Sequence, residues 1–430
     1  MSDAIWRVMN VGNESFAVTV ACRIAEFAPK QVSYAGSARC GRREGQKKVS
    51  SKLFDSRPPS YNASWTNAEQ GISNVMYQDI GRTIYLQARK ELENIELQGT
   101  GLDSVDVEQA QAWTLIAFYE IIRAYYRRAW MSIGRASRLL QLMGLHSIDN
   151  EGEFIEGNGR SLRNDIETEE QRRTFWMAYC LDRLVGIRNN WPLAFNELVI
   201  CTRLPASETD FQNGEPGFGG FLSEAISTDS EDNIPAFNEL IIFVTICARC
   251  LSHKQQTAIE PLYGGATQDF WDRHEWLHAL LIRKLGRISR MLSSSPIIMD
   301  PMRLFAIMVA YTALIYLHNI ANFSPSESVN QLSMPAYEEE ARVAALEIVK
   351  LAQNVDELSI FKVHPLSPFP MYHAADFLSR HCSSAVSYVS EIQKLVAVLQ
   401  SLKPVSDLAG HYLQLLKSFS PSVQTVEAGI

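Results

Sequence analysis

Clustered cysteines and an excess of positive charge are both missing from this sequence of 430 residues. Its cysteines are scattered, at Cys22, Cys40, Cys180, Cys201, Cys247, Cys250 and Cys382. An odd, unclustered set of this kind indicates reduced thiols in an intracellular protein and not a disulfide framework. The formal net charge of −8 excludes a generally basic nucleic-acid binder, so any contact with DNA must come from a local patch.

The sequence also lacks long apolar runs. A membrane-spanning helix needs about 20 predominantly apolar residues. The most apolar run, residues 304–317, is shorter and is followed directly by His318 and Asn319, so we expect a buried core helix there. The first residues show no apolar core of the length typical of a secretory signal. Hydrophobic residues at 46% and charged residues at 20% indicate a globular protein with a large core.

Phosphate loops, dinucleotide fingerprints and nucleophile elbows are absent. One short pattern, HEWLH from His274 to His278, fits the zinc-hydrolase motif H-E-x-x-H. On a helix it would place two zinc ligands on one face beside a general base, Glu275. However, the extended metzincin positions are not filled, and the helical segment about twenty residues later offers no glutamate as a third ligand. We therefore favour an ordinary helix with exposed polar residues and keep the zinc hydrolase as an alternative.

A second short pattern is the lone C-x-x-C formed by Cys247 and Cys250. A redox motif needs a βαβ context and a zinc site needs a second pair, and the sequence offers neither. Buried free cysteines are the favoured interpretation. We predict no catalytic residue, no bound cofactor and no metal site.

Helical periodicity fills most of the chain between breaks at glycine and proline. We expect helices at residues 13–29, 67–98, 106–122, 122–143, 166–187, 235–258, 268–293, 300–321, 336–358, 371–400 and 405–418. Residues 206–233 look like an acidic loop. There is no strand-rich region and no fixed-period repeat, so we predict an all-α fold, a large irregular multi-helix domain.

The helix predicted to begin at Ile122 has the clearest pattern. Its apolar residues recur every three or four positions as far as Met143, and therefore line one face. Gly144 followed by Leu145 predicts a left-handed stop with a hydrophobic contact.

Residues 169–211 are the most informative stretch. The acidic pair Glu169 and Glu170 lies in the first turn of a predicted helix, where negative charge favours the helix dipole. Glu169 precedes Arg173 by four residues, so their charges share one helix face. We also predict that Asp182 and Arg183 form an internal ion pair that anchors the following loop.

This stretch resembles the signature of the fungal-specific transcription factor domain, the helical middle homology region of fungal zinc-cluster regulators. In that family an acidic pair precedes an Arg-Arg pair, an aromatic-rich helix and an Asp-Arg, followed by a proline-containing loop and a Leu-Pro ending. The matching residues are Glu169, Glu170, Arg172, Arg173, Phe175, Trp176, Asp182, Arg183, Pro192, Leu204, Pro205, Asp210 and Phe211. Gly134-Arg135-Ala136, Gly144-Leu145-His146 and the Pro-Phe-rich segment at 365–370 extend the resemblance over residues 16–400.

The resemblance implies three segments of the chain. Residues 1–66 would hold a short helix and then a basic flexible segment without a zinc cluster. Residues 67–225 would hold the helical core with the signature, and residues 226–430 the C-terminal half of the same domain. Loss of Arg172, Arg173, Trp176, Asp182 or Arg183 is expected to act by destabilising this domain.

The six-cysteine zinc cluster that reads DNA in this family has no counterpart in the sequence. Only Cys22 and Cys40 precede the helical domain, and that fold depends on metal-bound thiolates. Two explanations are open: a segment upstream of Met1 has been lost from the gene as read, or this is a member without a cluster.

The resemblance implies a nuclear transcriptional regulator of a metabolic gene cluster, including secondary-metabolite pathways. Its partners would be a second copy, other regulators or a small-molecule effector, with no membrane. DNA would be reached through a partner or through the basic segment from Arg39 to Lys52, which could equally be a nuclear-import signal or a solvated loop. A repressor that sequesters a zinc-cluster partner is a further alternative.

Overall fold

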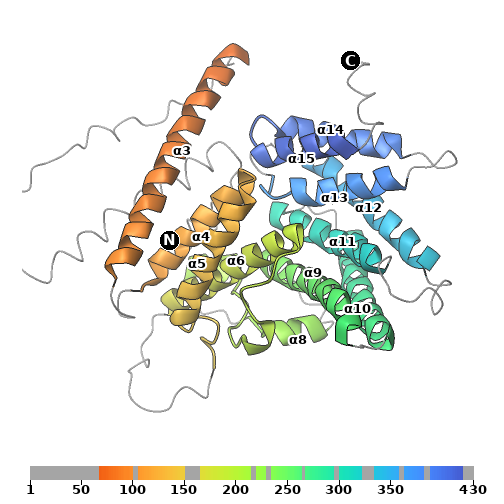
Figure 1. Ribbon diagram of the computed structural model, residues 1–430, viewed down its shortest axis with the longest axis horizontal. Helices are drawn as coiled ribbons and strands as arrows, with labels where there is room; N and C mark the ends of the chain where they lie inside the picture. Colours follow the sequence, from red (N-terminus) through yellow and green to blue (C-terminus); the bar gives the residue numbers. More distant parts are fainter. Residues whose placement is uncertain are drawn as a thin grey trace, which may run out of the picture.

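The computed structural model describes residues 67–99, 105–150, 165–214, 219–228, 234–263, 267–294, 300–321, 334–357, 363–381 and 388–419. Across these ranges it contains 13 α-helices and no strand, so the predicted all-α fold is confirmed (Figure 1). The helix predicted at 13–29 and the basic segment from Arg39 to Lys52 lie outside the described residues.

Four helices form the N-terminal part: α3 (Asn67–Gln98), α4 (Val107–Ile122), α5 (Tyr126–Leu142) and α6 (Asp165–Asn189). α4 begins where Asp106 Oδ1 accepts a hydrogen bond from the amide of Gln109 at 2.9 Å, which satisfies an amide that a helix start leaves unpaired. α4 packs against α3, α5 and α6 and is buried along nearly its whole length.

The start predicted for the helix at 122–143 is wrong. α4 ends at Ile122, and the chain turns through residues 123–125 before α5 begins at Tyr126. Ala124 takes a left-handed φ of 57° in this turn, which a continuous helix cannot contain. Ile122 and Tyr126 are four residues apart, so the apolar spacing continues across the break and conceals it.

The end of α5 matches the prediction. Gly144 has a φ of 69°, its amide donates to the carbonyl of Gln141 at 3.1 Å, and the amide of Leu145 donates to the carbonyl of Leu140 at 2.9 Å. These two bonds form a Schellman motif, and Leu145 is buried as its hydrophobic contact.

The acidic loop predicted at 206–233 contains two short helices, α7 (Glu208–Asn213) and α8 (Leu222–Ser227). α7 is held at both ends, because Ser207 Oγ accepts from the amide of Asp210 at 3.1 Å and Gly214 takes a left-handed φ of 71°. Helices this short show no apolar period, so the sequence pattern missed them.

Seven longer helices follow: α9 (Ala236–Ile259), α10 (Thr267–Ser294), α11 (Pro301–Ala321), α12 (Met334–Glu357), α13 (Pro368–Arg380), α14 (Val389–Leu402) and α15 (Asp407–Phe419). The single helix predicted at 371–400 is therefore wrong, since the α-helical segments α13 and α14 are separate there. Two 3₁₀ turns, η3 (Glu197–Val199) and η4 (Glu260–Tyr263), complete the described elements.

α9 and α11 lie at the centre of the fold and pack against each other (Figure 1). By length and composition both could cross a membrane, but 83% of the most apolar window in each is buried inside the protein. The prediction that the run at 304–317 is a buried core helix is confirmed. α6 packs against α9, and α15 against α4, so the two ends of the described chain share one core.

Candidate functional site

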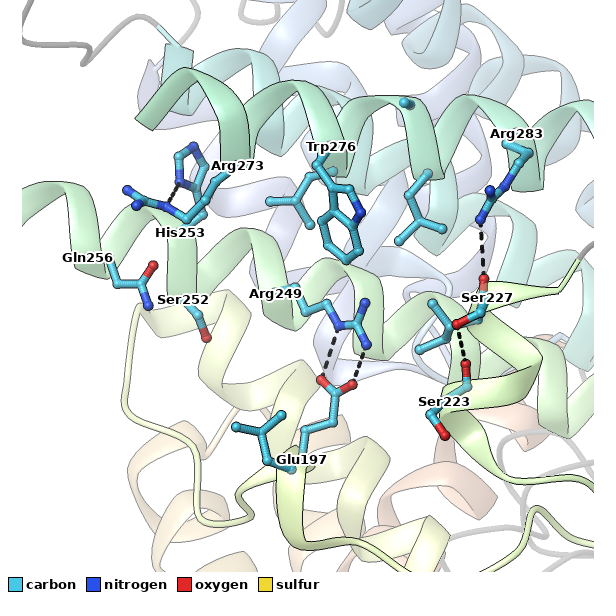
Figure 2. Close-up of a pocket in the computed structure, with 15 residues that line it drawn as sticks. Glu197, Ser223, Ser227, Arg249, Ser252, His253, Gln256, Arg273, Trp276 and Arg283 are labelled. Carbon is cyan, nitrogen blue, oxygen red and sulfur yellow. Dashed lines mark hydrogen bonds and ion pairs between the residues drawn. The ribbon is translucent and has the colours of Figure 1, made fainter. Parts of the chain in front are cut away.

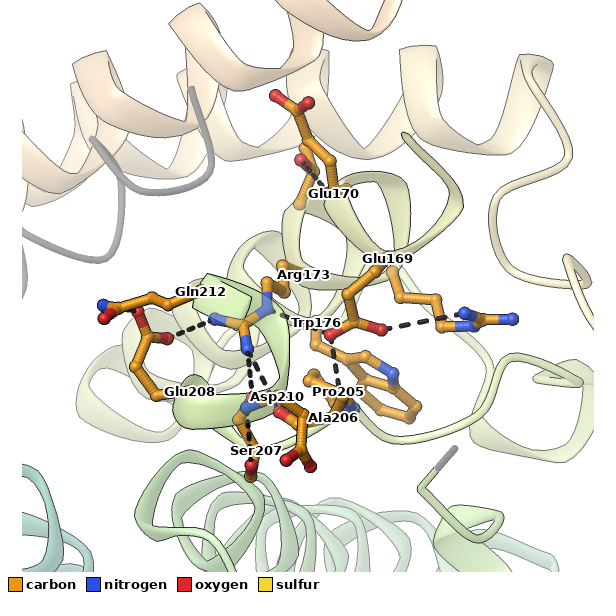
Figure 3. A network of polar contacts seen from close by, with 12 residues as sticks. Glu169, Glu170, Arg173, Trp176, Pro205, Ala206, Ser207, Glu208, Asp210 and Gln212 are labelled. Carbon is orange, nitrogen blue, oxygen red and sulfur yellow. Dashed lines mark hydrogen bonds and ion pairs between the residues drawn. The ribbon is translucent and has the colours of Figure 1, made fainter. Parts of the chain in front are cut away.

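Arg173 joins three segments of the signature (Figure 3). Its Nε donates to Glu169 Oε1 at 2.9 Å within α6, which is the predicted pairing at a spacing of four residues. Its other nitrogens donate to Glu208 Oε2 on α7 at 2.6 Å and to the carbonyl of Ala206 at 3.1 Å. The ring of Phe211 lies beneath the guanidinium, 4.2 Å from its carbon.

Glu169 is the buried acidic partner in this network. Its Oε1 also accepts from the amide of Ala206 at 2.9 Å, so a single carboxylate holds both Arg173 and the loop. Burial raises the pKa of Glu169, and Arg173 and the hydrogen bonds oppose that rise. α6 begins at Asp165, so Glu169 lies in its second turn and not in the first turn as predicted. Its role here is the tertiary contact with Arg173 and Ala206.

The other members of the acidic pair and of the Arg-Arg pair, Glu170 and Arg172, reach different partners. Arg172 Nε donates to Asp149 Oδ2 at 3.0 Å, and the same oxygen accepts from the amide of Arg203 at 2.8 Å. Glu170 turns away and accepts from Gln111 of α4 at 3.0 Å.

Two family-like motifs that lie far apart in the sequence meet here. The amide of Cys201 donates to the carbonyl of His146 at 2.8 Å, and Thr202 Oγ1 donates to the carbonyl of Leu145 at 2.8 Å. The segment after the Gly144 stop therefore runs beside the signature loop and fixes it to α5.

Trp176 and Pro205 position the same loop from inside. Trp176 is fully buried, and its Nε1 donates to the carbonyl of Arg203 at 2.7 Å. Its ring packs edge-on against Phe175 with centroids 5.1 Å apart. The carbonyl of Pro205 accepts from Asn238 Nδ2 of α9 at 2.9 Å, which ties the loop to the second half of the chain.

Asp182 and Arg183 are buried at the far end of α6. Arg183 lies 3.4 Å from Asp182 and donates to the carbonyl of Phe195 at 3.2 Å, while Asp182 accepts from the amide of Ala194 at 3.0 Å. Burial raises the pKa of Asp182, and Arg183 and the amides of Ala194 and Phe195 oppose that rise. The pair anchors the loop after α6 as predicted, and Pro192 in that loop is exposed.

A groove of about 760 Å³ opens beside this loop, between α9 and α10 (Figure 2). η3 and α8 form its other walls. Its apolar lining includes Leu198, Ile226, Trp276, Leu277 and Leu280.

Three arginines line the same groove. Arg249 forms a two-point ion pair with Glu197 of η3, with one contact at 3.2 Å. Arg273 donates to Glu260 at 2.8 Å, and Arg283 donates to the carbonyl of Ile226 at 3.4 Å. Trp276 lies over Arg249, with the guanidinium carbon 5.3 Å from its ring. The sequence did not predict this groove, because its lining residues come from four separate elements.

The HEWLH segment lies in the helix α10, as expected, and Glu275 is exposed, but one of its polar residues is not. His274 is fully buried among aromatic rings, and both of its ring nitrogens lack a hydrogen-bond partner in the described structure. Burial lowers its pKa to about 3. The expected exposure is thus wrong for His274, while Glu275 and Trp276 are exposed.

His278, the second histidine of the pattern, contacts Glu340 of α12. The rings of His274 and His278 both pack edge-on against Tyr337, with centroids 5.0 Å and 4.9 Å away. Within the described ranges, no three histidine, cysteine, aspartate or glutamate side chains come together as a metal site would require.

The cysteines of the C-x-x-C pattern are free and buried in α9, as predicted. Burial raises the pKa of Cys247 to about 12, and it also raises the pKa of Cys250. At neutral pH both stay protonated and behave as apolar side chains.

Sequence reasoning missed Asp149, Glu208 and Gln111, which complete the signature network. Glu208 carried a signal, since it lies between Pro205 and Asp210, within the Leu-Pro ending of the signature. Asp149 and Gln111 carried none, because their partners are set by how α4 and the loop after α5 pack on α6.

Comparison with known proteins places these features in a family. The model of the fungal-specific transcription factor domain matches residues 66–283. A pigment biosynthesis transcriptional activator of Monascus ruber is 40% identical over 343 residues, covering 79% of this chain and 62% of the relative. A citrinin biosynthesis transcriptional activator of Monascus purpureus is 40% identical over 355 residues, covering 83% and 61%.

An ascochitine biosynthesis cluster transcriptional regulator of Didymella fabae is 34% identical over 391 residues, covering 84% of this chain and 67% of the relative. The chain spans about three fifths of the length of the first two relatives. No solved structure matches it.

These relatives are transcription factors and not enzymes, which sets aside the zinc hydrolase. The signature at 169–211 lies inside the matched region, and its charged residues are the ones that hold the loop after α6 in place. The chain belongs to the fungal-specific transcription factor domain family.

Proposed function

We propose that this chain is the helical regulatory part of a fungal transcriptional activator that controls a secondary-metabolite biosynthesis cluster. One observation carries the proposal: the family match over residues 66–283 coincides with relatives named for the regulation of pigment, citrinin and ascochitine biosynthesis. The matched region contains the buried network around Arg173, whose contacts hold the signature loop to α6 and α7.

The domain would act in the nucleus by association, with a second copy or with another regulator. It would reach DNA through such a partner or through the segment from Arg39 to Lys52. The negative net charge of the chain supports an indirect or strictly local contact.

We also propose that residues 67–225 and 226–430 work as one domain. Contacts across this boundary support it: α6 packs against α9, α4 packs against α15, and Asn238 donates to the carbonyl of Pro205. Binding of a partner or ligand to one half would then change the packing of the other, because the halves share buried side chains.

Chromatin immunoprecipitation of the tagged protein, combined with transcript profiling of a deletion strain, tests the proposal. We expect enrichment at the promoters of a biosynthesis cluster whose transcripts fall on deletion. Transcripts that rise instead would favour the repressor. Absence of both enrichment and transcript change would exclude a regulator.

A matched variant separates the two routes to DNA. Replacing Arg42, Arg43, Lys47 and Lys48 by alanine removes the centre of the basic segment. Lost enrichment with normal nuclear import would assign the DNA contact to that segment, and retained enrichment would assign it to a partner.

A further inference from the structure

The groove between α9 and α10 has the size and the composition of a small-molecule site. Its volume of about 760 Å³ lies within the range typical of ligand sites, about 300–1,000 Å³. Such sites combine an apolar lining with a few fixed polar groups, and this groove has both.

Two large apolar side chains remain uncovered on its walls. Trp276 of α10 is 54% exposed and Leu198 of η3 is 92% exposed. Below them the apolar lining is continuous with the core, since Leu277 and Leu280 are buried. A ligand with an apolar ring system would cover Trp276 and bury this surface, which is favourable in proportion to the area removed from water.

Charge at the groove favours an anion. Arg249, Arg273 and Arg283 line it, and Glu197 is the single carboxylate among the lining residues. Ion pairs to Glu197 and Glu260 hold the first two guanidinium groups in place, so they lose little freedom on binding. Arginine also has the fork geometry that suits a carboxylate or sulfonate.

One buried polar atom in the lining has no assigned role. His253 is 2% exposed, and its Nε2 has no hydrogen-bond partner in the described part of the chain. Its Nδ1 lies 3.5 Å from Arg273 Nε. A groove that holds an unsatisfied imidazole nitrogen beside an arginine offers a specific polar contact at the end where His253 and Arg273 lie together (Figure 2).

We propose that this groove binds a small organic acid with an apolar ring body. The ring would pack against Trp276 and Leu198, and the acid group would contact the arginines. The site is formed by η3 of the signature loop together with α8, α9 and α10. A bound ligand would therefore hold elements from both halves of the chain together. The proposal concerns binding by the purified protein and does not depend on the transcriptional role.

Fluorescence titration with two probes tests it. The anionic probe is 8-anilinonaphthalene-1-sulfonate, and its neutral counterpart is N-phenyl-1-naphthylamine, which keeps the rings and lacks the sulfonate. We expect saturable binding of both at one site, and tighter binding of the anion. No saturable binding, or equal affinity for the two probes, would overturn the proposal.

Four variants locate the site. Trp276→Ala should weaken both probes about tenfold, since a ring contact and its buried area are lost. Arg283→Gln keeps a donor for the carbonyl of Ile226 and should weaken only the anion, also about tenfold. Ser223→Trp places a large side chain in the groove from an exposed position and should abolish binding of both probes. Met131→Ala, an exposed apolar residue on α5, is the control and should change nothing.

Since Trp276 and Ser223 are exposed, these variants should unfold at the same urea concentration as the parent, which a parallel titration checks. If Trp276→Ala, Arg283→Gln and Ser223→Trp all bind the anion as tightly as Met131→Ala, the probe binds elsewhere and the groove is not the site.

Discussion

At the residue scale, the contacts of Arg173 explain why an arginine occupies this position of the signature. Its guanidinium contacts a carboxylate in its own helix, a carboxylate in α7, two loop carbonyls and an aromatic ring. A lysine could not make these contacts together, because it lacks the planar fork of donors.

Arg173→Ala should therefore lower the free energy of unfolding by about 3–5 kcal/mol, since it leaves the carboxylate of Glu169 buried without its main partner. Urea unfolding at pH 7 measures the loss. The matched control is Lys350→Ala, which breaks a surface pair with Glu347 and should cost less than about 1 kcal/mol. Equal losses in the two variants would show that the network does not support the fold.

His274 gives a prediction about pH. Its pKa is about 3 in the folded protein against 6.5 for an exposed histidine, and burial is the main cause. The neighbouring His253, His278 and His318 lower it further. Above pH 6.5 neither state binds the proton. As the pH falls from 6.5 towards 3, only the unfolded chain takes it up, and stability is lost.

His274→Phe should remove this share of the pH dependence. Between pH 6 and pH 4 the parent should lose about 1 kcal/mol more per pH unit than the variant. Urea titrations at each pH measure the difference. His364→Phe should behave alike, because the pKa of His364 is also about 3 and its ring stacks on Phe305. Parallel pH curves for parent and variants would contradict the assignment.

At the scale of elements, α5 contains a matched pair of glycines. Gly144 ends the helix with a φ of 69°, whereas Gly134 lies inside it, and a Cβ added at either position would meet no atom within 4 Å. The two sites therefore differ in backbone conformation and not in the room available for a side chain.

Gly144→Ala should destabilise the protein by about 1–2 kcal/mol, because an alanine is strained in the left-handed region. Gly134→Ala should stabilise it by about 0.5–1 kcal/mol, because alanine restricts the unfolded chain and suits a helix. Thermal unfolding of both variants distinguishes the effects by sign. Shifts of the same sign would mean that the Schellman motif does not end α5 in solution.

At the scale of the whole molecule, the shared core predicts a single cooperative unit. α4 and α11 belong to different halves of the sequence, and both are almost wholly buried in one hydrophobic cluster. Their slowest amides should therefore exchange through the same global opening.

Hydrogen exchange read by mass spectrometry checks this expectation. The slowest amides of α4 and α11 should report opening free energies within about 1 kcal/mol of each other, and both should fall together in urea. The exposed helix α7 serves as an internal control that exchanges earlier. A gap of several kcal/mol between α4 and α11 would place a domain boundary near residue 225.

The sequence by itself determined the all-helical fold, most helix positions, the Gly144 stop, the Glu169–Arg173 pair and the Asp182–Arg183 pair. These features depend on contacts within four residues or on strong local conformational preference, and both are visible in spacing and residue type. The resemblance of residues 169–211 identified the family for the same reason, since its charged and aromatic residues recur at fixed positions.

Only the tertiary structure decided which partners complete the network and where a groove forms. Asp149 and Gln111 meet α6 because the loop after α5 and the helix α4 pack on it, and sequence separation carries no record of that packing. The break at Ala124 stayed hidden because the apolar period continues through it. His274 is buried against expectation, because which side of α10 is buried depends on the positions of α9 and α12.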